Sequence, residues 1–211
     1  MITPLQKLST SFPQFVYLGE QLQRVDPNGL KCAVHGMYFT NTDAKFLNEF
    51  SNRAYVMMHL RFDGHFGFPG GVVDPEDETI VSALNREVAE EMGATRADVA
   101  FRDEDFVVVH QCTRSKYLLY FFAKRVTMDQ FEYLEQTTLR AEEYGRETMG
   151  VVRVPIYTME EGFRGLPAFL TNSFAGNAKL QLLSGLLVSS ILSWEEIHGA
   201  LRASCPSSIS A

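Results

Sequence analysis

Three glutamates lie close together on one segment that is predicted to be helical. Glu87, Glu90 and Glu91 are spaced i, i+3 and i+4, and at about 100° per residue this spacing gathers their side chains on one arc of the helix. Like charges so placed destabilise an isolated helix. A divalent cation reverses the sign of the effect, because Mg²⁺ prefers carboxylate oxygens and leaves coordination positions open for substrate phosphate. The spacing alone is compatible with a metal site or with a solvated acidic face.

The helix that carries these glutamates has clear predicted ends. Asp74 or Asp77 is expected to cap its first turn. Glu76 and Glu78 suit the positive end of the helix dipole. Gly93 supplies the left-handed residue that commonly ends a helix. Apolar residues at steps of three and four form the face that we expect to pack on a sheet: Ile80, Val81, Leu84, Val88 and Met92.

The segment from residue 71 to residue 94 resembles the Nudix box. The string REVAEEMGA, which begins at Arg86, matches the REUxEExGU half of that box, in which U is aliphatic, and Glu78 stands at the expected distance before it. The family pattern has a glycine six residues before this glutamate, at the position of Val72, whereas here the glycine is Gly71. The loop is therefore one residue longer than the pattern, and the match in the helix is unaffected.

The Nudix resemblance implies a role for each charged residue of the box. Glu78 is expected to pair with Arg86 and so to hold the loop to the helix. Glu87 and Glu91 are expected to bind metal, and Glu90 to bind a further metal or to position the attacking water. An arginine fork can hold one carboxylate bidentately and leave the neighbouring glutamates free for cations. The implied cofactor is Mg²⁺ or Mn²⁺.

The resemblance narrows to one subfamily, the inosine diphosphatase and snoRNA-decapping Nudix hydrolases, over roughly residues 28 to 190. It depends on RFDG at 61–64, GFPGG at 67–71, VRVPIYT at 152–158, GLPAFL at 165–170 and NSF at 172–174. The implied fold is the Nudix fold, an α/β/α sandwich with a mixed central sheet.

In this comparison, four residues form the pocket for a purine nucleotide. His35 and Arg61 contact the base and the phosphates, Phe68 lines the pocket, and Gln181 reads the base from the C-terminal helix. An arginine beside a phosphate cleft has a role that lysine fills poorly. Phe68 could equally be a core aromatic residue, and Gln181 a surface glutamine.

The same comparison extends the metal site beyond the helix. The main-chain carbonyl of Gly70 becomes a metal ligand with Glu87 and Glu91, and His110 and Glu147 approach the metal cluster from neighbouring loops. His110 could instead simply end a strand, and Glu147 could be one acid on a solvated loop. A lone histidine in a strand, such as His59, is more often a hydrogen-bonded core residue than a ligand.

The implied reaction is metal-assisted hydrolysis of a pyrophosphate or terminal phosphate. Bound Mg²⁺ or Mn²⁺ neutralises phosphate oxygens and lowers the pKa of a coordinated water. Glu90 or Glu147 then accepts the proton of that water. The implied substrates are inosine, deoxyinosine and other purine nucleoside diphosphates, and m7G or nucleotide-cofactor caps on RNA. A neutral histidine and an amide could distinguish hypoxanthine from adenine, whose exocyclic amine reverses the polarity at position 6.

Two alternatives stay open at this point. One is a catalytically minor Nudix scaffold that binds RNA or protein, which we disfavour because a paralogue of that kind has lost the glutamates that are present here. The other is a Nudix hydrolase for another diphosphate, such as ADP-ribose, a dinucleotide or coenzyme A. The chemistry would then be the same and only the pocket would differ.

The remaining chain predicts the scaffold of this site. Strands are expected at 32–39, 55–62, 106–111, 117–123 and 151–156, and helices at 127–138, 178–192 and 194–198. This order predicts an α/β protein with helices on both faces of a mixed sheet. We divide it into an N-terminal extension at 1–27, a Nudix domain at 28–200 and a flexible tail at 201–211. Asp26 to Gly29 predicts a turn, and Pro155 an edge strand.

Composition limits the class and the partners. The chain has 211 residues, of which 45% are hydrophobic and 21% charged, as in an ordinary globular domain. Its net charge of −7 argues against a broad electrostatic grip on nucleic acid, but not against an RNA end held in a metal-filled cleft. The three cysteines form no CxxC pair, and we find neither a membrane span nor a signal peptide in the sequence. These features predict an intracellular protein. The resemblance implies a homodimer formed through the apolar C-terminal helix, and location in the nucleus, including the nucleolus and nucleoplasm, and in the cytoplasm.

Overall fold

A central mixed sheet organises the molecule. The computed structural model describes residues 2–21 and 29–205. The sheet has the strand order β1-β8-β9-β2-β5-β10, in which β2 and β9 are parallel and the other neighbours antiparallel. These strands are β1 (Phe15–Gly19), β8 (Phe106–Cys112), β9 (Tyr117–Arg125), β2 (Lys31–Asn41), β5 (Ala54–Arg61) and β10 (Thr148–Arg153). Two short strands extend it: β6 (Phe66–Gly67) beside β5 and β7 (Gly70–Val72) beside β2.

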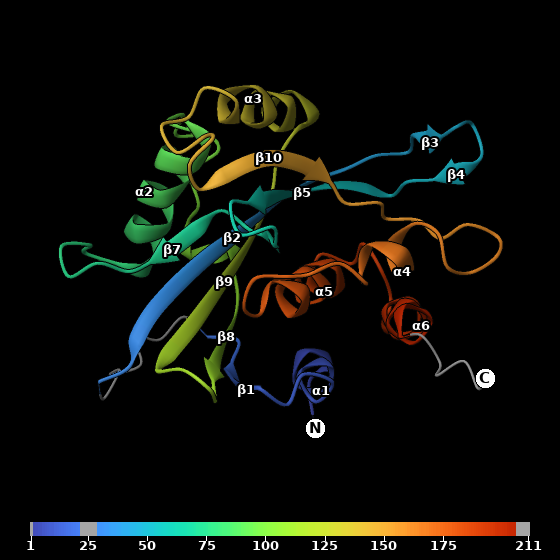
Figure 1. Ribbon diagram of the computed structural model, residues 1–211, viewed down its shortest axis with the longest axis horizontal. Helices are drawn as coiled ribbons and strands as arrows, with labels where there is room; N and C mark the ends of the chain where they lie inside the picture. The colour runs from blue at the N-terminus through green and yellow to red at the C-terminus, as the bar shows by residue number, and fades with distance from the viewer. Residues whose placement is uncertain (1, 22–28, 206–211) are drawn as a thin grey trace.

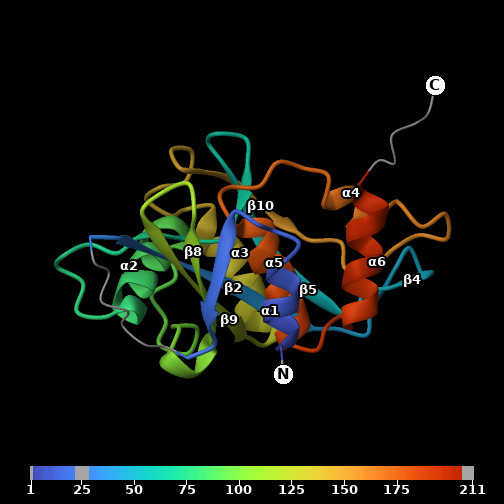
Figure 2. The ribbon, with the colours of Figure 1, turned by 90° about the horizontal axis from the view of Figure 1, so that it is seen from below.

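Helices cover both faces of this sheet (Figure 1). On one face lie α2 (Ile80–Met92) and α3 (Met128–Thr138), over a core that includes Leu84 and Phe131. On the other lie α5 (Ala178–Val188) and α1 (Pro4–Ser9), with α4 (Leu166–Phe169) and α6 (Trp194–Ser204) beyond them (Figure 2). The predicted α/β/α arrangement with a mixed sheet is confirmed. Among the described helices, none is long and apolar enough to cross a membrane.

The ends of α2 differ in part from the prediction. Gly93 ends the helix with φ 63°, as expected, and donates its N–H to Ala89. The N-cap, however, is Thr79, whose side chain accepts from the backbone N–H of Ser82 while the Ser82 hydroxyl accepts from the N–H of Thr79. The predicted caps Asp74 and Asp77 were wrong, because the helix begins later and a hydroxyl pair already satisfies its first amides.

The other predicted helices and strands are present with shifted ends. β8 and β9 form the expected antiparallel hairpin, and α3 begins after its capping residue Thr127. β10 occupies an edge of the sheet, as the nearby Pro155 predicts, but starts earlier, at Thr148. α6 runs on to Ser204 instead of ending at residue 198. The connection between β2 and β5 contains a small hairpin, β3 (Lys45–Phe46) and β4 (Phe50–Ser51).

The segment before residue 22 packs on the core. Leu5 and Leu8 of α1 are buried, and β1 pairs antiparallel with β8. The predicted turn at 26–29 lies largely outside the described residues, as does the tail from 206 onwards. The division into extension, domain and tail stays a prediction.

The apolar side chains of α5 are buried within the single chain. The buried residues include all four of its leucines before Leu187, namely Leu180, Leu182, Leu183 and Leu186. Burial on all sides explains the apolar composition that we took for a dimer surface. Of the described part of α5, only Val188 is a large exposed apolar residue.

Candidate active site

The glycine-rich loop and α2 meet at Gly70 and Glu91. The backbone N–H of Gly70 donates to Oε2 of Glu91 over 2.9 Å, and only 4% of Glu91 is exposed. Gly70 has φ 134°, and a Cβ there would overlap the backbone of Val34. At Gly71 a Cβ would come within 2.6 Å of Oε1 of Glu87. Glycine at both positions therefore allows the loop backbone to lie directly against two of the predicted metal-binding glutamates.

Burial makes these carboxylates unusually basic. Burial, with smaller contributions from the nearby charges of Glu87 and Glu147, raises the pKa of Glu91 to about 8, against the hydrogen bond from Gly70. The pKa of Glu87 is also raised, first by burial and then by Glu90 and Glu147, although Arg86 opposes this. Acidic charge is therefore concentrated in a poorly solvated place, a situation that a cation relieves.

Arg86 lies at the centre of the acidic cluster, but its partner in the loop is not the predicted one. Its Nε and Nη2 donate to the two oxygens of Asp77, over 3.2 and 3.0 Å, while Glu78 is exposed. The predicted pair of Glu78 and Arg86 was wrong. Asp77 stands six residues after Gly71, as the family pattern asks of its acid, so the additional residue lies between this acid and Arg86.

Arg86 also contacts the catalytic candidates. Its Nη1 lies 3.0 Å from Oε1 of Glu87 and 3.3 Å from Oε2 of Glu90. The expectation that the arginine leaves both glutamates free was therefore wrong. Glu90 is the more open of the two, because 44% of its side chain is exposed against 17% for Glu87. The guanidinium supplies positive charge between two acids where the sequence predicts a metal ion.

The donor set fits a hard divalent cation, although the side chains are not drawn together as ligands. Over residues 2–21 and 29–205, no three acidic, histidine or cysteine side chains converge closely enough to hold an ion as they stand. Glu91 is buried beside Glu87 and Glu147, and carboxylates are the ligands that Mg²⁺ and Mn²⁺ prefer. The roles of Gly70, Glu87, Glu90 and Glu91 as ligands stay predictions.

His59 is a residue of this cluster that the sequence did not reveal. Its Nδ1 lies 3.9 Å from Oε2 of Glu91 and 3.3 Å from the Thr148 hydroxyl, and its Nε2 has no hydrogen-bond partner. Burial, with a contribution from Arg61, lowers the pKa of His59 to about 4, so the ring is neutral at pH 7. We expected a core histidine at this position. A helix–strand contact across 32 residues of sequence gives no local signal.

Arg61, at the end of β5, lies between the acidic cluster and the predicted base pocket. It lowers the pKa of both His59 and His35 and opposes the raised pKa of Glu91. Its Nε lies 3.4 Å from Asp63, a long contact that leaves the guanidinium able to bind another anion. Its position fits the predicted phosphate contact.

A second polar group lies between the sheet and α5. Asn177, Gln181 and Ser184 are spaced four and three residues apart, so they share one face of α5, and each is buried with an unpartnered side-chain atom. His35 on β2 and His110 on β8 point to the same side of the sheet. Each also has a buried Nδ1 without a partner. Buried polar atoms of this kind are normally satisfied, so together they indicate a binding site.

The structure therefore turns His35 towards the face of the sheet that carries Gln181, and it separates His110 from the acids. Nε2 of His110 lies 2.9 Å from the hydroxyl of Ser9 on α1, on the face of the sheet opposite α2. Its predicted approach to the metal cluster is contradicted by this contact. Burial lowers the pKa of His35 and of His110 to about 4, so both rings are neutral at pH 7. Phe68 is buried against Phe121, with ring centroids 5.4 Å apart.

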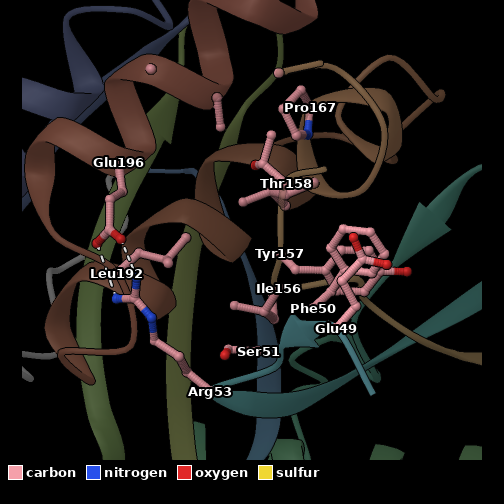
Figure 3. Close-up of a pocket in the computed structure, with 14 residues that line it drawn as sticks. Glu49, Phe50, Ser51, Arg53, Ile156, Tyr157, Thr158, Pro167, Leu192 and Glu196 are labelled. Carbon is pink, nitrogen blue, oxygen red and sulfur yellow. Dashed lines mark hydrogen bonds and ion pairs between the residues drawn. The ribbon is translucent and has the colours of Figure 1, made fainter. Parts of the chain in front are cut away.

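A separate hollow of about 540 Å³ opens beside the β3–β4 hairpin (Figure 3). Arg53 and Glu196 form an ion pair on one wall, and Tyr157 stacks on Phe50 with centroids 5.8 Å apart on another. Its two glutamates, Glu49 and Glu196, belong to different walls, and Glu196 is already paired. This hollow lacks the concentrated acids of the α2 cluster and is not a candidate for the same chemistry.

Comparisons with known proteins identify relatives that match most of this chain. The sequence profile of the family described as Nudt16-like, U8 snoRNA-decapping enzyme-like, matches residues 32–192. The U8 snoRNA-decapping enzyme of Mus musculus is 39% identical over 73% of this chain and 79% of its own length. That of Xenopus laevis is 37% identical over 83% and 84%. The Tudor-interacting repair regulator protein of Homo sapiens is 31% identical over 87% and 85%.

Solved structures of lower similarity align with parts of this chain. The NUDIX domain of Shewanella oneidensis NrtR, complexed with ADP ribose, aligns with a TM-score of 0.48 at 16% identity, over 80% of this chain and 95% of that domain. The Caenorhabditis elegans Ap4A hydrolase, as a binary complex, aligns with a TM-score of 0.46 at 11% identity, over 72% and 93%.

Proposed function

Because the chain belongs to the U8 snoRNA-decapping enzyme-like family of Nudix hydrolases, we propose that it hydrolyses purine nucleoside diphosphates, those of inosine and deoxyinosine first, and the caps of RNA. The attacked group is a pyrophosphate or terminal phosphate, and the proposed cofactor is Mg²⁺ or Mn²⁺. The RNA part of this proposal is supported by the names of the relatives, and the nucleotide part by the buried, unpartnered polar side chains of α5 and the facing strands.

The observation that carries the proposal is the buried, basic carboxylate of Glu91. Burial of this group beside Glu87 and Glu147 is unfavourable without a cation, and its one backbone hydrogen bond offsets only part of the cost. When bound, a divalent ion supplies the missing positive charge, neutralises phosphate oxygens and lowers the pKa of a coordinated water. Glu87, Glu91 and the carbonyl of Gly70 would hold it.

The remaining residues of the cluster can position and deprotonate the nucleophile. Glu147 is exposed and close enough to raise the pKa of Glu87 and Glu91, whereas Glu90 is held by Arg86. Glu147 is therefore the better placed of the two to accept a proton from water. Arg61 lies where it can bind a substrate phosphate and neutralise the charge that develops there.

The buried polar side chains of α5 and the facing strands have the groups needed to recognise hypoxanthine. They include neutral histidines, which can donate or accept, and an amide with an unpartnered Nε2 at Gln181. The O6 and N7 of hypoxanthine accept hydrogen bonds, so an amide donor satisfies the base and is itself satisfied. If the Gln181 amide donates to O6, adenine, which carries an amine at position 6, leaves that donor unpaired at a cost of about 1–3 kcal/mol.

One substrate panel tests the proposal. The pure chain, supplied with Mg²⁺ or Mn²⁺, is incubated with inosine, adenosine and guanosine diphosphates, ADP-ribose, m7G-capped RNA and NAD-capped RNA. We expect inosine diphosphate and at least one capped RNA to be hydrolysed. The proposal fails if both are left intact while the protein is folded. Hydrolysis of ADP-ribose alone would preserve the reaction type and change the substrate.

A second candidate is a binding module on the same scaffold. It is favoured by the 31% identity to a protein named as a Tudor-interacting repair regulator. Glu91→Gln separates the two possibilities: an enzyme loses turnover, whereas a binding module keeps its affinity for its partner. The homodimer remains a prediction that sedimentation at micromolar concentration would test, and a nuclear location one that imaging of the tagged protein would test.

A further inference from the structure

A cationic groove lies between the residues that follow α1, the start of α5, and α6. Figure 2 shows these three helices on one face of the sheet. We use the name cationic groove for the hollow of about 840 Å³ lined by Phe12, Lys179, His198 and Arg202, among others. It adjoins a smaller hollow of about 210 Å³, whose walls again include Phe12 and Lys179 and add Phe174. Because they share Phe12 and Lys179, the two hollows lie side by side.

The charge of this groove is opposite to that of the chain. The chain carries a net charge of −7, yet both charged residues that line the two hollows, Lys179 and Arg202, are basic. Lys7 adds a third cation nearby, with its ammonium 4.3 Å from the ring centre of Trp194, which in turn stacks on His198. A local positive potential on an acidic protein predicts a polyanionic ligand.

Aromatic rings lie beside these cations. Phe12 and Phe174 line the groove and are only partly buried, and the ammonium of Lys179 lies 5.2 Å from the ring centre of Phe174. Burial lowers the pKa of Lys179, so pairing with an anion would favour its charged form. Cations that follow a backbone beside exposed ring faces are the usual means of binding single-stranded nucleic acid.

The groove leads towards the candidate active site. Its smaller hollow is bounded by Asn177, which precedes α5 and shares the helix face of Gln181 in the base pocket. Phe174 packs on Phe66, and the backbone of residues 173–175 is hydrogen-bonded to β6. The next residue of β6, Gly67, lies against the side chain of Arg61. A chain lying in the groove could therefore enter the pocket at its own end.

We propose that the cationic groove binds the single-stranded RNA that follows a 5′ cap, with its phosphates on Lys179 and Arg202. The inference rests on the proposed RNA-decapping function and deepens it. It places the cap between Gln181 and the acidic cluster, and the following nucleotides along α5 and α6. Free nucleoside diphosphates, which have no RNA chain, use the pocket without the groove.

The test compares two double variants that each remove two positive charges. Lys179→Gln with Arg202→Gln alters the groove, and Lys45→Gln with Arg102→Gln alters exposed sites elsewhere. Binding of a capped single-stranded RNA of about 12 nucleotides is measured by fluorescence anisotropy in the Glu91→Gln background, from about 50 to about 200 mM salt. Two phosphate contacts contribute about 1.4 to the slope of log affinity against log salt, or about sevenfold in affinity over this range.

We expect the groove variant to lose this contribution to the salt dependence of binding. In the active background, the same two substitutions should raise the KM for capped RNA about tenfold or more. The kinetics of inosine diphosphate hydrolysis should stay unchanged. Arg202→Gln alone, at an exposed end of α6, should give half the change in slope without a risk of misfolding. Equal salt dependence of binding for the groove and control variants would contradict RNA binding in the groove, even if capped RNA is cleaved. RNA binding that depends on the groove, without cleavage of the cap, would instead support RNA binding in the groove and refute the decapping function. Binding of a protein partner in the groove, with no RNA binding that depends on Lys179 and Arg202, would also contradict the proposal.

Discussion

Replacement of Glu91 by glutamine should move stability and activity in opposite directions. The folded pKa of Glu91 is about 8, against 4.5 for an unperturbed glutamate, so the folded protein holds the proton more tightly than the unfolded chain does. Below about pH 4.5, Glu91 is protonated in both states and therefore does not lower the free energy of unfolding. As the pH rises towards 8, the free energy of unfolding of the metal-free protein falls by about 5 kcal/mol, at 1.36 kcal/mol per pKa unit.

Glu91→Gln removes this titration and keeps an oxygen that can accept from the N–H of Gly70. We expect metal-free Glu91→Gln to be more stable than the wild type at about pH 8.5, by up to about 5 kcal/mol, and equally stable near pH 4.5. Turnover should fall by roughly 10³-fold, about 4 kcal/mol of transition-state stabilisation. Urea unfolding in EDTA at several pH values measures the first effect, and a phosphate-release assay the second.

Two further measurements make the argument refutable. Glu90→Gln is the matched control, since it changes an exposed glutamate of the same helix and should alter stability by less than about 0.5 kcal/mol. Mn²⁺ at about 100 times its dissociation constant should stabilise the wild type by about 2.7 kcal/mol and Glu91→Gln by much less. Parallel pH profiles for wild type and Glu91→Gln would show that Glu91 is not the buried, basic acid on which the metal site depends.

Three other substitutions test single contacts. Asp77→Asn, which breaks the bidentate pair with Arg86, should cost about 1–2 kcal/mol in urea unfolding, whereas Glu78→Gln should cost less than about 0.5 kcal/mol because Glu78 is exposed. Gly71→Ala should weaken Mn²⁺ binding, measured by calorimetry, since its methyl group would displace the Glu87 carboxylate. Gln181→Leu should raise the KM for inosine diphosphate about tenfold with little change in kcat, through loss of one hydrogen bond.

The sequence predicts α2 well where the signal is local. The apolar stripe of Leu84, Val88 and Met92 and the glycine stop at Gly93 are confirmed, because both follow from the geometry of a single helix. The N-terminus was misplaced because several acids precede α2 and any of them could cap a helix. The hydroxyl pair that caps it has serine at the third helical position, where the familiar capping box has glutamate or glutamine.

The ion-pair partner of Arg86 and the face of the sheet on which His110 lies depend on local geometry that the spacing of residues in the sequence does not reveal. Arg86 selects Asp77 over the adjacent Glu78 because the loop turns one side chain towards α2 and the other towards solvent. In β8 the register shifts between Phe106 and Val108, so Val107 and Val108 both pack on the α5 face. Such an irregularity reverses which later residues face which side, and so His110 comes to face α1.

The cost of Glu91 is itself an argument about function. A scaffold that only binds partners gains nothing from a buried carboxylate beside Glu87 and Glu147, and glutamine at this position would keep the bond to Gly70 without the charge. Natural proteins accept such destabilisation at sites where activity requires it. Above about pH 8 the three acids of the metal-free protein repel one another, and a cation that binds them recovers more stability the more tightly it binds. A binding module would show no such recovery, so the stabilisation of the wild type by Mn²⁺ distinguishes an enzyme from a scaffold before any substrate is tried.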